Sequence, residues 1–395
     1  MRVLHVIPAV APRYGGPSSS IVEMCRALRE AGAEPVIATT NADGPGQLRV
    51  PLGSVTEWQG VPAIFFQRQW SEAFKYAHAL GRWVDSNVDR FQVVHIHAPL
   101  SYASIAASAA AHRRGIPFIV RPLGTLDSWS LQQKALKKQL LLPFVSRMLQ
   151  QAAAVHCTSA SELSDVSGSF QLTNGVTIPL GVQRSLLESN PADEDERERD
   201  RYVLALSRLH PVKNLDALVD AFVTLDASGA RGGWRLVIGG DGDDAYTRSL
   251  DRHIARVPGA YVQRVGWMQG DAKRMLVRGA SLFALPSHHE NFGVGLIEAM
   301  AAGVPVLVSE GVHLSTDIAR AGAGWVCAGS VDSLCSALAH AIADDAERKA
   351  RAVAARRLAS GFAWPVVARA LLDLYRRVAL PATPVTQPEP LEAAH

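Results

Sequence analysis

"HHENFGVGLIEAM", residues 288–300, places Glu290 and Glu298 eight positions apart, with Gly293 and Gly295 between them. An unbroken helix turns about 100° per residue, so the two carboxylates would point roughly 80° apart. The glycines predict a different geometry, in which Glu290 lies in a loop, a helix begins near Gly293, and Glu298 lies one or two turns into that helix. A loop carboxylate, a helix N-terminus and a helix carboxylate would then converge on one ligand.

The sequence on both sides of this stretch alternates buried strands with helices. Apolar runs typical of buried strands are RVLHVIPAV (2–10), EPVIATT (34–40), QVVHIHA (92–98), GIPFIVRP (115–122), RYVLALSRL (201–209), WRLVIGGDG (234–242), AYVQRVGWM (260–268), GASLFALPS (279–287) and VPVLVSE (304–310). Helical spacing is predicted over 21–32, 101–114, 131–152 with an interruption at Pro143, 215–225, 295–303, 332–344 and 362–380. This alternation predicts an α/β fold with parallel sheets covered on both faces.

The charged segment ESNPADEDERERDR, residues 188–201, separates two halves that repeat the same strand, turn and helix order. Ala192 is its only apolar residue, which is typical of a solvated linker. We predict one Rossmann-like domain over 1–187, a second over 202–361, a helix over 362–380, and a proline-rich disordered tail over 381–395. Such sheets bind ligands at the carboxyl ends of their strands, so the cleft between the domains is the predicted site.

Composition narrows the class of protein. The 395 residues are 48% hydrophobic and 19% charged, with a net charge of +3, which is typical of a globular chain without a strong field for nucleic acid. The four cysteines are far apart and indicate buried free thiols in a reduced compartment. Residues 1–10 are interpreted as a first strand rather than a signal peptide, and no apolar run reaches the length of a membrane span.

Two cations follow a predicted strand in the second half. Arg208 and Lys213 lie five residues apart, where an arginine fork and a lysine point charge can clamp a diphosphate. The alternative is a pair of ordinary surface cations. The next turn contains Gly240, which would let backbone approach a ligand, and the pair Asp241 and Asp243, which could hold a divalent cation or simply form an Asp–Gly turn.

A helix N-terminus attracts an anion, and carboxylates accept hydrogen bonds from sugar hydroxyls. The stretch 288–300 therefore suits a ligand with hydroxyls on both sides of a diphosphate, which describes a nucleotide sugar. The alternatives are a metal site built from His288, His289 and Glu290, and a pair of acids for glycoside hydrolysis. Adjacent histidines chelate one metal poorly, so we expect no metal site.

Three further features have two interpretations each. His95 and His97 share one face of a predicted strand, with His97 at the carboxyl end toward the ligand and His95 in the core. The turn around Gly16 either approaches the ligand or is a simple turn. Basic residues in the helix over 131–152 indicate either a solvated face or contact with an anionic membrane: Lys134, Lys137, Lys138 and Arg147.

These runs together resemble the family 4 glycosyltransferases of the GT-B fold. The resemblance in the second half is carried by SRLHPVKNLDALVDAF (207–222), GGDG (239–242) and LPSHHENFGVGLIEAMAAGVPVLVS (285–309). In the first half GGPSSSIVEMCRALREAG (15–32), VVHIHAP (93–99) and RPLGTLDSW (121–129) are similar to the N-terminal domain of that family. The resemblance covers roughly residues 1–375 and implies two Rossmann-like domains, one on the acceptor side and one that binds the nucleotide sugar, facing across a cleft, with the last helix crossing back to the first domain.

The resemblance also implies roles for individual residues in a transfer that retains the anomeric configuration. Arg208 and Lys213 would bind the donor diphosphate and stabilise the leaving group. Glu298 would hold the ribose hydroxyls, and Glu290 would contact the donor sugar. The other expected site residues are His97 near the reacting sugar, Gly16 facing the diphosphate, Gly240 in the glycine turn, and Asn291, Phe292 and Gly293 presenting backbone to sugar and phosphate.

We therefore predict a cytoplasmic hexosyltransferase of surface polysaccharide biosynthesis that needs no metal or other cofactor, because its own cations face the leaving diphosphate. The expected partners are the nucleotide sugar and a glycan or lipid-linked acceptor, with no nucleic acid, and with peripheral contact at the inner membrane face as an additional expectation. The alternatives are a GT-B epimerase or phosphorylase, or a non-catalytic GT-B scaffold. Leu123 stands where many relatives carry histidine, which leaves the acceptor side unassigned.

Overall fold

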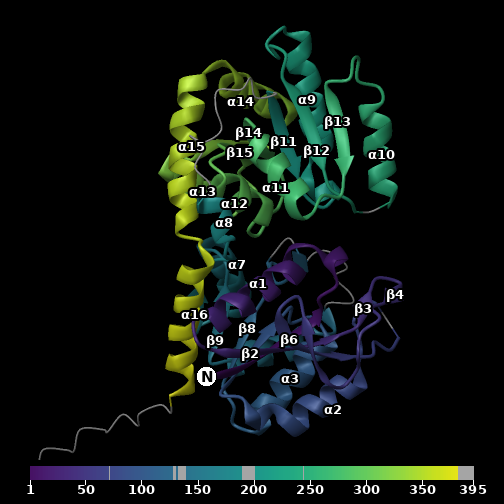
Figure 1. Ribbon diagram of the computed structural model, residues 1–395, viewed down its shortest axis with the longest axis vertical. Coiled ribbons are helices and arrows are strands. Elements are labelled where there is room, and N and C mark those ends of the chain that lie inside the picture. The colour runs from purple at the N-terminus through teal and green to yellow at the C-terminus, as the bar shows by residue number, and fades with distance from the viewer. Residues whose placement is uncertain (71, 128–129, 132–138, 189–200, 243, 381–395) are drawn as a thin grey trace, which may run out of the picture.

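The computed structural model describes residues 1–380 apart from 71, 128–129, 132–138, 189–200 and 243. It forms two lobes stacked along the long axis, with the N-terminal lobe below and the C-terminal lobe above (Figure 1). Several predictions fall outside the described residues: the tail 381–395, nearly all of the linker 188–201, the basic residues Lys134, Lys137 and Lys138, and Asp243.

The N-terminal lobe contains one sheet in the order β10-β9-β8-β7-β1-β2-β6-β5, parallel except for the pairing of β5 with β6. The near-continuous apolar runs of its central strands agree with burial on both faces. Its strands are β1 (Arg2–Ala9), β2 (Glu34–Thr40), β5 (Val55–Trp58), β6 (Val61–Phe66), β7 (Val93–His97), β8 (Phe118–Arg121), β9 (Ala154–Cys157) and β10 (Gly175–Thr177). A separate hairpin joins β3 (Ala42–Asp43) to β4 (Gly46–Gln47).

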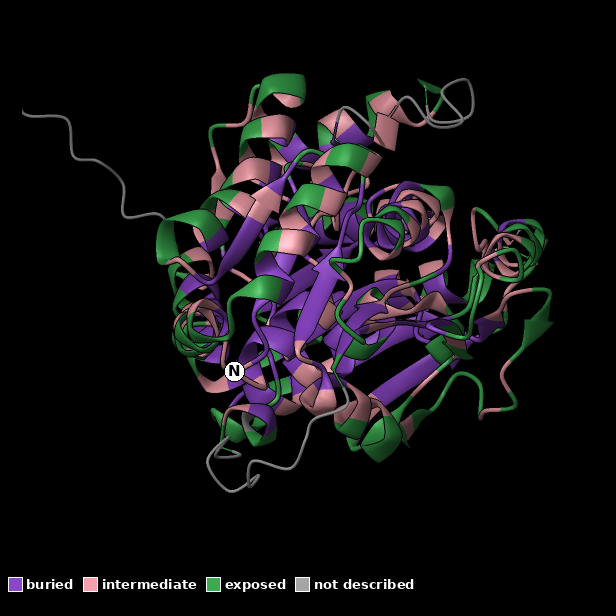
Figure 2. Cartoon of the chain, turned by 90° about the horizontal axis from the view of Figure 1, so that it is seen from above, coloured by how far each residue is buried: buried purple, intermediate pink, exposed green. Residues whose placement is uncertain are grey.

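Helices cover both faces of this sheet, as the alternation along β1 shows. Leu4 and Val6 pack in one core with α2 (His78–Asn87), α3 (Tyr102–Arg113) and α6 (Leu142–Gln151), whereas Val3 and Ile7 pack in another with α1 (Gly16–Glu30) and α16 (Trp364–Ala379). Figure 2 shows the same arrangement, with buried strands inside and helices whose outer faces are exposed.

The C-terminal lobe repeats this plan with a fully parallel sheet in the order β13-β12-β11-β14-β15-β16. Its strands are β11 (Tyr202–Leu206), β12 (Arg235–Gly239), β13 (Val262–Gly266), β14 (Leu282–Leu285), β15 (Val306–Ser309) and β16 (Gly324–Cys327). Its helices are α9 (Leu215–Ala227), α10 (Asp244–Ile254), α11 (Gly270–Gly279), α12 (Val294–Ala301), α13 (Ser315–Ala321), α14 (Val331–Ala343) and α15 (Asp345–Ser360). The predicted α/β class with two Rossmann-like parallel sheets is confirmed.

The final helix joins the two lobes. α16 follows α15 along one side of the molecule and runs down onto the N-terminal lobe (Figure 1). Its buried residues Trp364, Leu371 and Tyr375 belong to the core shared with α1 and β1. Val182 pairs through its backbone with Phe362 and Trp364, so the chain crosses between the lobes at two adjacent points.

The predicted interruption near Pro143 is confirmed: residues 140–141 form a turn, and α6 begins at Leu142 with Pro143 in its first turn, where its missing N–H has no partner to lose. Other elements differ from the sequence-based expectation. The helix α15 and the strands β5 and β6 were not predicted: α15 is rich in charged residues, β5 has only four residues, and Pro62 lies within the apolar run of β6. Within the described part of the chain, no helix is both long enough and apolar enough to cross a bilayer.

Candidate active site

A cavity of about 540 Å³ lies between the two lobes. Its walls contain residues that directly follow strands of both sheets, such as Val10 after β1, Thr158 after β9, Ser207 after β11 and Gly240 after β12. The carboxyl ends of parallel strands are where such sheets bind ligands, and this volume is typical of a pocket for a small-molecule ligand.

The cavity brings together all of the predicted site residues except His97. Its lining includes Gly16, Arg208, Lys213, Gly240, Glu290, Asn291, Phe292, Gly293 and Glu298. Most of them come from the C-terminal lobe, and Gly16 faces them from the N-terminal lobe.

Lys213 and Glu290 form an ion pair on the upper wall. The Lys213 ammonium lies 2.6 Å from a Glu290 carboxylate oxygen, and both side chains are largely buried. A short 3-10 turn over Pro211–Lys213 carries the lysine, and the backbone N–H of His288 donates to the carbonyl of Val212. The loop that holds Glu290 is therefore tied to the turn that holds Lys213, whereas Arg208 is exposed on the cavity wall.

A second pair was missed by the sequence analysis. Lys273, on α11, lies 2.7 Å from a carboxylate oxygen of Glu298 on α12 and also lines the cavity. Arg274 follows it on the same wall, so four cations and two carboxylates of the C-terminal lobe face this space: Arg208, Lys213, Lys273, Arg274, Glu290 and Glu298. The excess positive charge suits an anionic ligand.

Two helices begin at the cavity, α1 from the lower lobe and α12 from the upper lobe. As far as the chain is described, neither N-terminus receives a side-chain cap, so their first N–H groups stay available to an anion. Gly293 precedes α12 with φ +75, and Gly240 has φ +141 with its would-be Cβ 1.9 Å from the carbonyl oxygen of Ser207. A Cβ would clash at Gly240, and the left-handed backbone at Gly293 is one that other residues adopt only at a cost in free energy.

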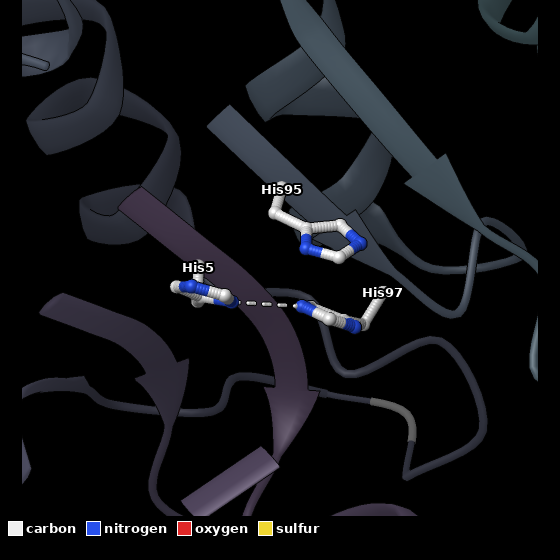
Figure 3. Close-up of side chains that lie close together, drawn as sticks. All are labelled: His5, His95 and His97. Carbon is white, nitrogen blue, oxygen red and sulfur yellow. Dashed lines mark hydrogen bonds between the residues drawn. The ribbon is translucent and has the colours of Figure 1, made fainter. Parts of the chain in front are cut away.

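His97, in contrast, lies in the core of the N-terminal lobe and not at the cavity. Its ring is fully buried under the end of β7, 3.2 Å from the ring of His5 on β1, and it does not line the cavity (Figure 3). Burial and the nearby charge of Arg121 hold the pKa of His97 well below its ordinary value, so the ring is neutral at pH 7. Its predicted contact with the reacting sugar has no support from this geometry.

The buried histidines are the group in the described chain whose side chains could together reach one metal ion. The ligand atoms of His5, His95 and His97 lie within 4.8 Å of one another. Both ring nitrogens of His95 are already used, in hydrogen bonds with Tyr375 and His156, and the Arg121 guanidinium lies close enough to lower the pKa of these rings. A cation would have to break these bonds beside a positive charge, so the cluster fits a hydrogen-bonded core better than a metal site.

Two side-chain hydrogen bonds connect the lobes on either side of Glu290 in the sequence. His289 lies 2.9 Å from the buried carboxylate of Asp127, and Asn291 donates to the hydroxyl of Thr158 at 3.0 Å. Burial opposes ionisation of Asp127, but hydrogen bonds from His289 and Ser130 outweigh it and lower the pKa of the carboxyl. Glu290 therefore lies between two residues that are anchored to the opposite lobe.

Comparisons with known proteins agree with this architecture. A family model described as "Glycosyl transferase 4-like domain" matches residues 15–181, and one described as "Glycosyl transferases group 1" matches residues 188–358. The chain is 26% identical over 394 residues to the phosphatidyl-myo-inositol mannosyltransferase of Mycobacterium leprae, with 96% of this chain and 97% of the relative covered. It is 25% identical over 389 residues to the GDP-mannose:cellobiosyl-diphosphopolyprenol alpha-mannosyltransferase of Komagataeibacter xylinus, with 96% and 93% covered.

Among solved structures, sucrose-phosphate synthase from Thermosynechococcus elongatus superposes with a TM-score of 0.78 at 19% identity, covering 95% of this chain and 98% of that one. This similarity concerns the fold. The two family models, which together match residues 15–181 and 188–358, and the full-length relatives show that the chain belongs to the family 4 glycosyltransferases of the GT-B fold, enzymes that transfer a sugar from a nucleotide-sugar donor.

Proposed function

We propose that this glycosyltransferase moves a hexose, with retention of anomeric configuration, onto a hydroxyl of a glycan or lipid-linked acceptor in surface polysaccharide biosynthesis. The observation that carries the proposal is the convergence of Arg208, Lys213 and the N-terminus of α12 with Glu290 and Glu298 in one cavity. The cations suit a diphosphate and the carboxylates suit hydroxyls on either side of it.

The reaction breaks the bond between the anomeric carbon and the phosphate oxygen. The leaving nucleoside diphosphate gains negative charge, which Arg208, Lys213 and the start of α12 are positioned to stabilise. The acceptor hydroxyl attacks the anomeric carbon from the face that the phosphate leaves, and its proton passes to a phosphate oxygen. This same-face route requires no protein nucleophile beneath the sugar.

The names of two relatives support the proposed acceptor class. The names of two full-length relatives specify phosphatidyl-myo-inositol and cellobiosyl-diphosphopolyprenol, both of which are lipids. A cytoplasmic enzyme with peripheral contact at the inner membrane face would meet such acceptors. That contact is part of the proposal.

Thermal unfolding of the purified protein with UDP-, GDP- and ADP-sugars, without metal, tests the donor site. A ligand that binds only the folded state raises the midpoint by mass action, so one base should stabilise the protein clearly. Anomeric analysis of the product by NMR would then test retention. If no nucleotide sugar shifts the midpoint, a non-catalytic scaffold becomes the better interpretation.

Glu298→Ala is expected to weaken donor binding about 10- to 100-fold, since hydrogen bonds to a charged group are worth about 1.5–3 kcal/mol. Turnover at saturating donor should change less, because the ribose lies away from the breaking bond. A donor titration of Glu298→Ala beside Glu298→Gln, which keeps one acceptor oxygen, measures both effects. An unchanged donor affinity would remove Glu298 from the ribose role.

Excess EDTA is expected to leave turnover unchanged. Arg208, Lys213 and the start of α12 already supply positive charge where the diphosphate is proposed to leave, so a divalent ion is not needed. The measurement is initial rate with and without chelator, followed by addition of Mg²⁺ or Mn²⁺. Loss of activity that either ion restores would favour the metal interpretation of the turn at Asp241.

A further inference from the structure

An aromatic cluster lies on the N-terminal lobe, close in sequence to Glu72 and Lys75, which contact Tyr14 of the cavity wall. The indole of Trp70 is 82% exposed and stacks on Tyr76, with ring centroids 4.7 Å apart and planes inclined by 10°. Tyr76 in turn contacts Tyr102, and Phe74 meets Tyr102 edge-on. We call Trp70 and Tyr76 the aromatic platform, with Tyr102 and Phe74 as its support.

The backbone holds Trp70 in this exposed position. Its φ is +53, in the left-handed region that bulky residues rarely adopt, and its carbonyl accepts a hydrogen bond from the Arg68 guanidinium at 3.1 Å. A large apolar side chain that is kept out of the core, on a strained backbone, is a feature more typical of a binding site than of packing.

Two residues between Trp70 and Tyr76, namely Glu72 and Lys75, contact Tyr14 of the cavity wall. The Tyr14 ring lines the cavity, and the Lys75 ammonium lies 4.6 Å from the centre of that ring. The Tyr14 hydroxyl donates to Glu72 at 2.5 Å, and burial together with this bond raises the pKa of the phenol, which therefore stays a neutral donor. The segment that carries the platform is thus fixed to the lower wall of the cavity.

The class of ligand at the aromatic platform can be inferred from which residues of the cavity suit the donor. Most residues suited to the donor lie on the C-terminal lobe, and on the N-terminal lobe only Gly16 and the start of α1 were assigned to it, so the acceptor is expected on the Tyr14 side of the N-terminal wall. A sugar ring has an apolar face of C–H groups that covers an indole well, while its hydroxyls stay at the edge. Arg68 and Lys75, which are close to the platform in the sequence, are both paired with Glu72, at 3.6 and 3.0 Å, so their positive charge is partly balanced and attracts anionic lipid less.

We propose that Trp70 and Tyr76 form an acceptor subsite, where a sugar unit of a glycan stacks on the indole while another unit presents its hydroxyl inside the cavity. This inference rests on the proposed function, because it requires a transfer reaction in the cavity. It assigns the acceptor to carbohydrate chains of two or more units, whether free or attached to a lipid.

The test uses the full chain and three variants: Trp70→Ala, Trp70→Phe, and Phe144→Ala, which removes an exposed aromatic residue of α6 as a matched control. Saturation-transfer difference NMR measures Kd for maltotetraose, cellotetraose and α-1,6-mannotetraose. Trp70→Ala should weaken binding at least tenfold, whereas Trp70→Phe and Phe144→Ala should stay within threefold of the parent. Because Trp70 is exposed, these substitutions should leave folding intact.

Two results would overturn the subsite. One is equal tetrasaccharide binding by the parent and Trp70→Ala. The other is a parent protein that binds none of the tetrasaccharides but binds phosphatidylglycerol vesicles through Trp70. Thermal stabilisation by nucleotide sugars is measured on the same samples. If nucleotide sugars stabilise the parent and Trp70→Ala alike, a failure to bind tetrasaccharides counts against the subsite alone. If no nucleotide sugar stabilises the parent, the proposed function itself fails.

Discussion

Lys213→Ala is expected to lower kcat by about 100- to 1,000-fold, the loss found when one preorganised donor to developing charge is removed. The ammonium lies in the same cavity as Arg208 and the start of α12, where the diphosphate leaves, and it is mostly buried, so water replaces it poorly. Steady-state turnover at saturating donor is the measurement. Arg208 remains in the variant, so donor binding should weaken less than turnover.

Lys213→Ala changes two properties of the cavity, and the experiment has to distinguish them. Lys213 pairs with Glu290 at 2.6 Å, so its removal also leaves a largely buried carboxylate without its partner. The double variant Lys213→Ala/Glu290→Gln removes that charge, and Lys349→Ala, which removes an exposed lysine, serves as a control for the loss of a cation. If Lys213→Ala turned over as fast as the parent protein, Lys213 would not be a residue that stabilises the leaving diphosphate.

The grouping of the proposed donor residues in one cavity could be predicted from the sequence because these residues are close along the chain. Lys213 follows Arg208 in one turn after β11, and Glu290 to Glu298 spans one loop and the helix after it, so strand, turn and helix order alone brings them to one sheet edge. Gly293 marked the start of the helix correctly, because only glycine accepts its backbone conformation at low cost.

The residues that were misplaced or missed depend on contacts between distant elements. The alternation along β7 put His95 and His97 on one face correctly, but the position of His5 on the neighbouring strand turns that face into a buried cluster. Lys273 was missed because its contact with Glu298 joins α11 to α12, and no local pattern marks a pair between two helices. The aromatic platform likewise depends on Tyr14 meeting residues some sixty positions later.

Glu162→Gln is the second substitution from which we expect a large effect. Glu162, at the start of α7 (Ala160–Phe170), is fully buried, and its carboxylate accepts from the N–H of Gly124 at 2.6 Å and from the N–H and hydroxyl of Thr158 at 2.6 and 2.8 Å. The Thr158 hydroxyl donates its proton to Glu162, so the lone pair of that hydroxyl oxygen is free to face Asn291 of the opposite lobe. The Asn291 amide donates a hydrogen bond to this oxygen at 3.0 Å.

An amide at position 162 would turn an NH₂ group toward one of these donors and would remove a buried charge. Burial lowers the pKa of Arg121 to about 10, and the charge of Glu162 opposes that shift, so Glu162→Gln also leaves a buried guanidinium with less compensation. We expect a loss of about 2–4 kcal/mol in the free energy of unfolding, the cost of unsatisfied buried polar groups. Turnover should fall about tenfold, since Leu123 and Thr158 line the cavity beside Asn291.

Thermal unfolding and turnover of Glu162→Gln, Thr158→Val and Asn291→Ala separate stability from positioning. Thr158→Val removes the hydroxyl and leaves Glu162 charged, so it should lower turnover with a smaller loss of stability. Asp85→Asn, which removes an exposed carboxylate of the same lobe, is the control. If Glu162 acts on catalysis through Thr158 and Asn291, the loss in the double variant Glu162→Gln/Asn291→Ala should be smaller than the sum of the single losses. If the losses of turnover in the two single variants simply added in the double variant, Glu162 would support the fold of the N-terminal lobe without orienting the loop that holds Glu290 and Asn291.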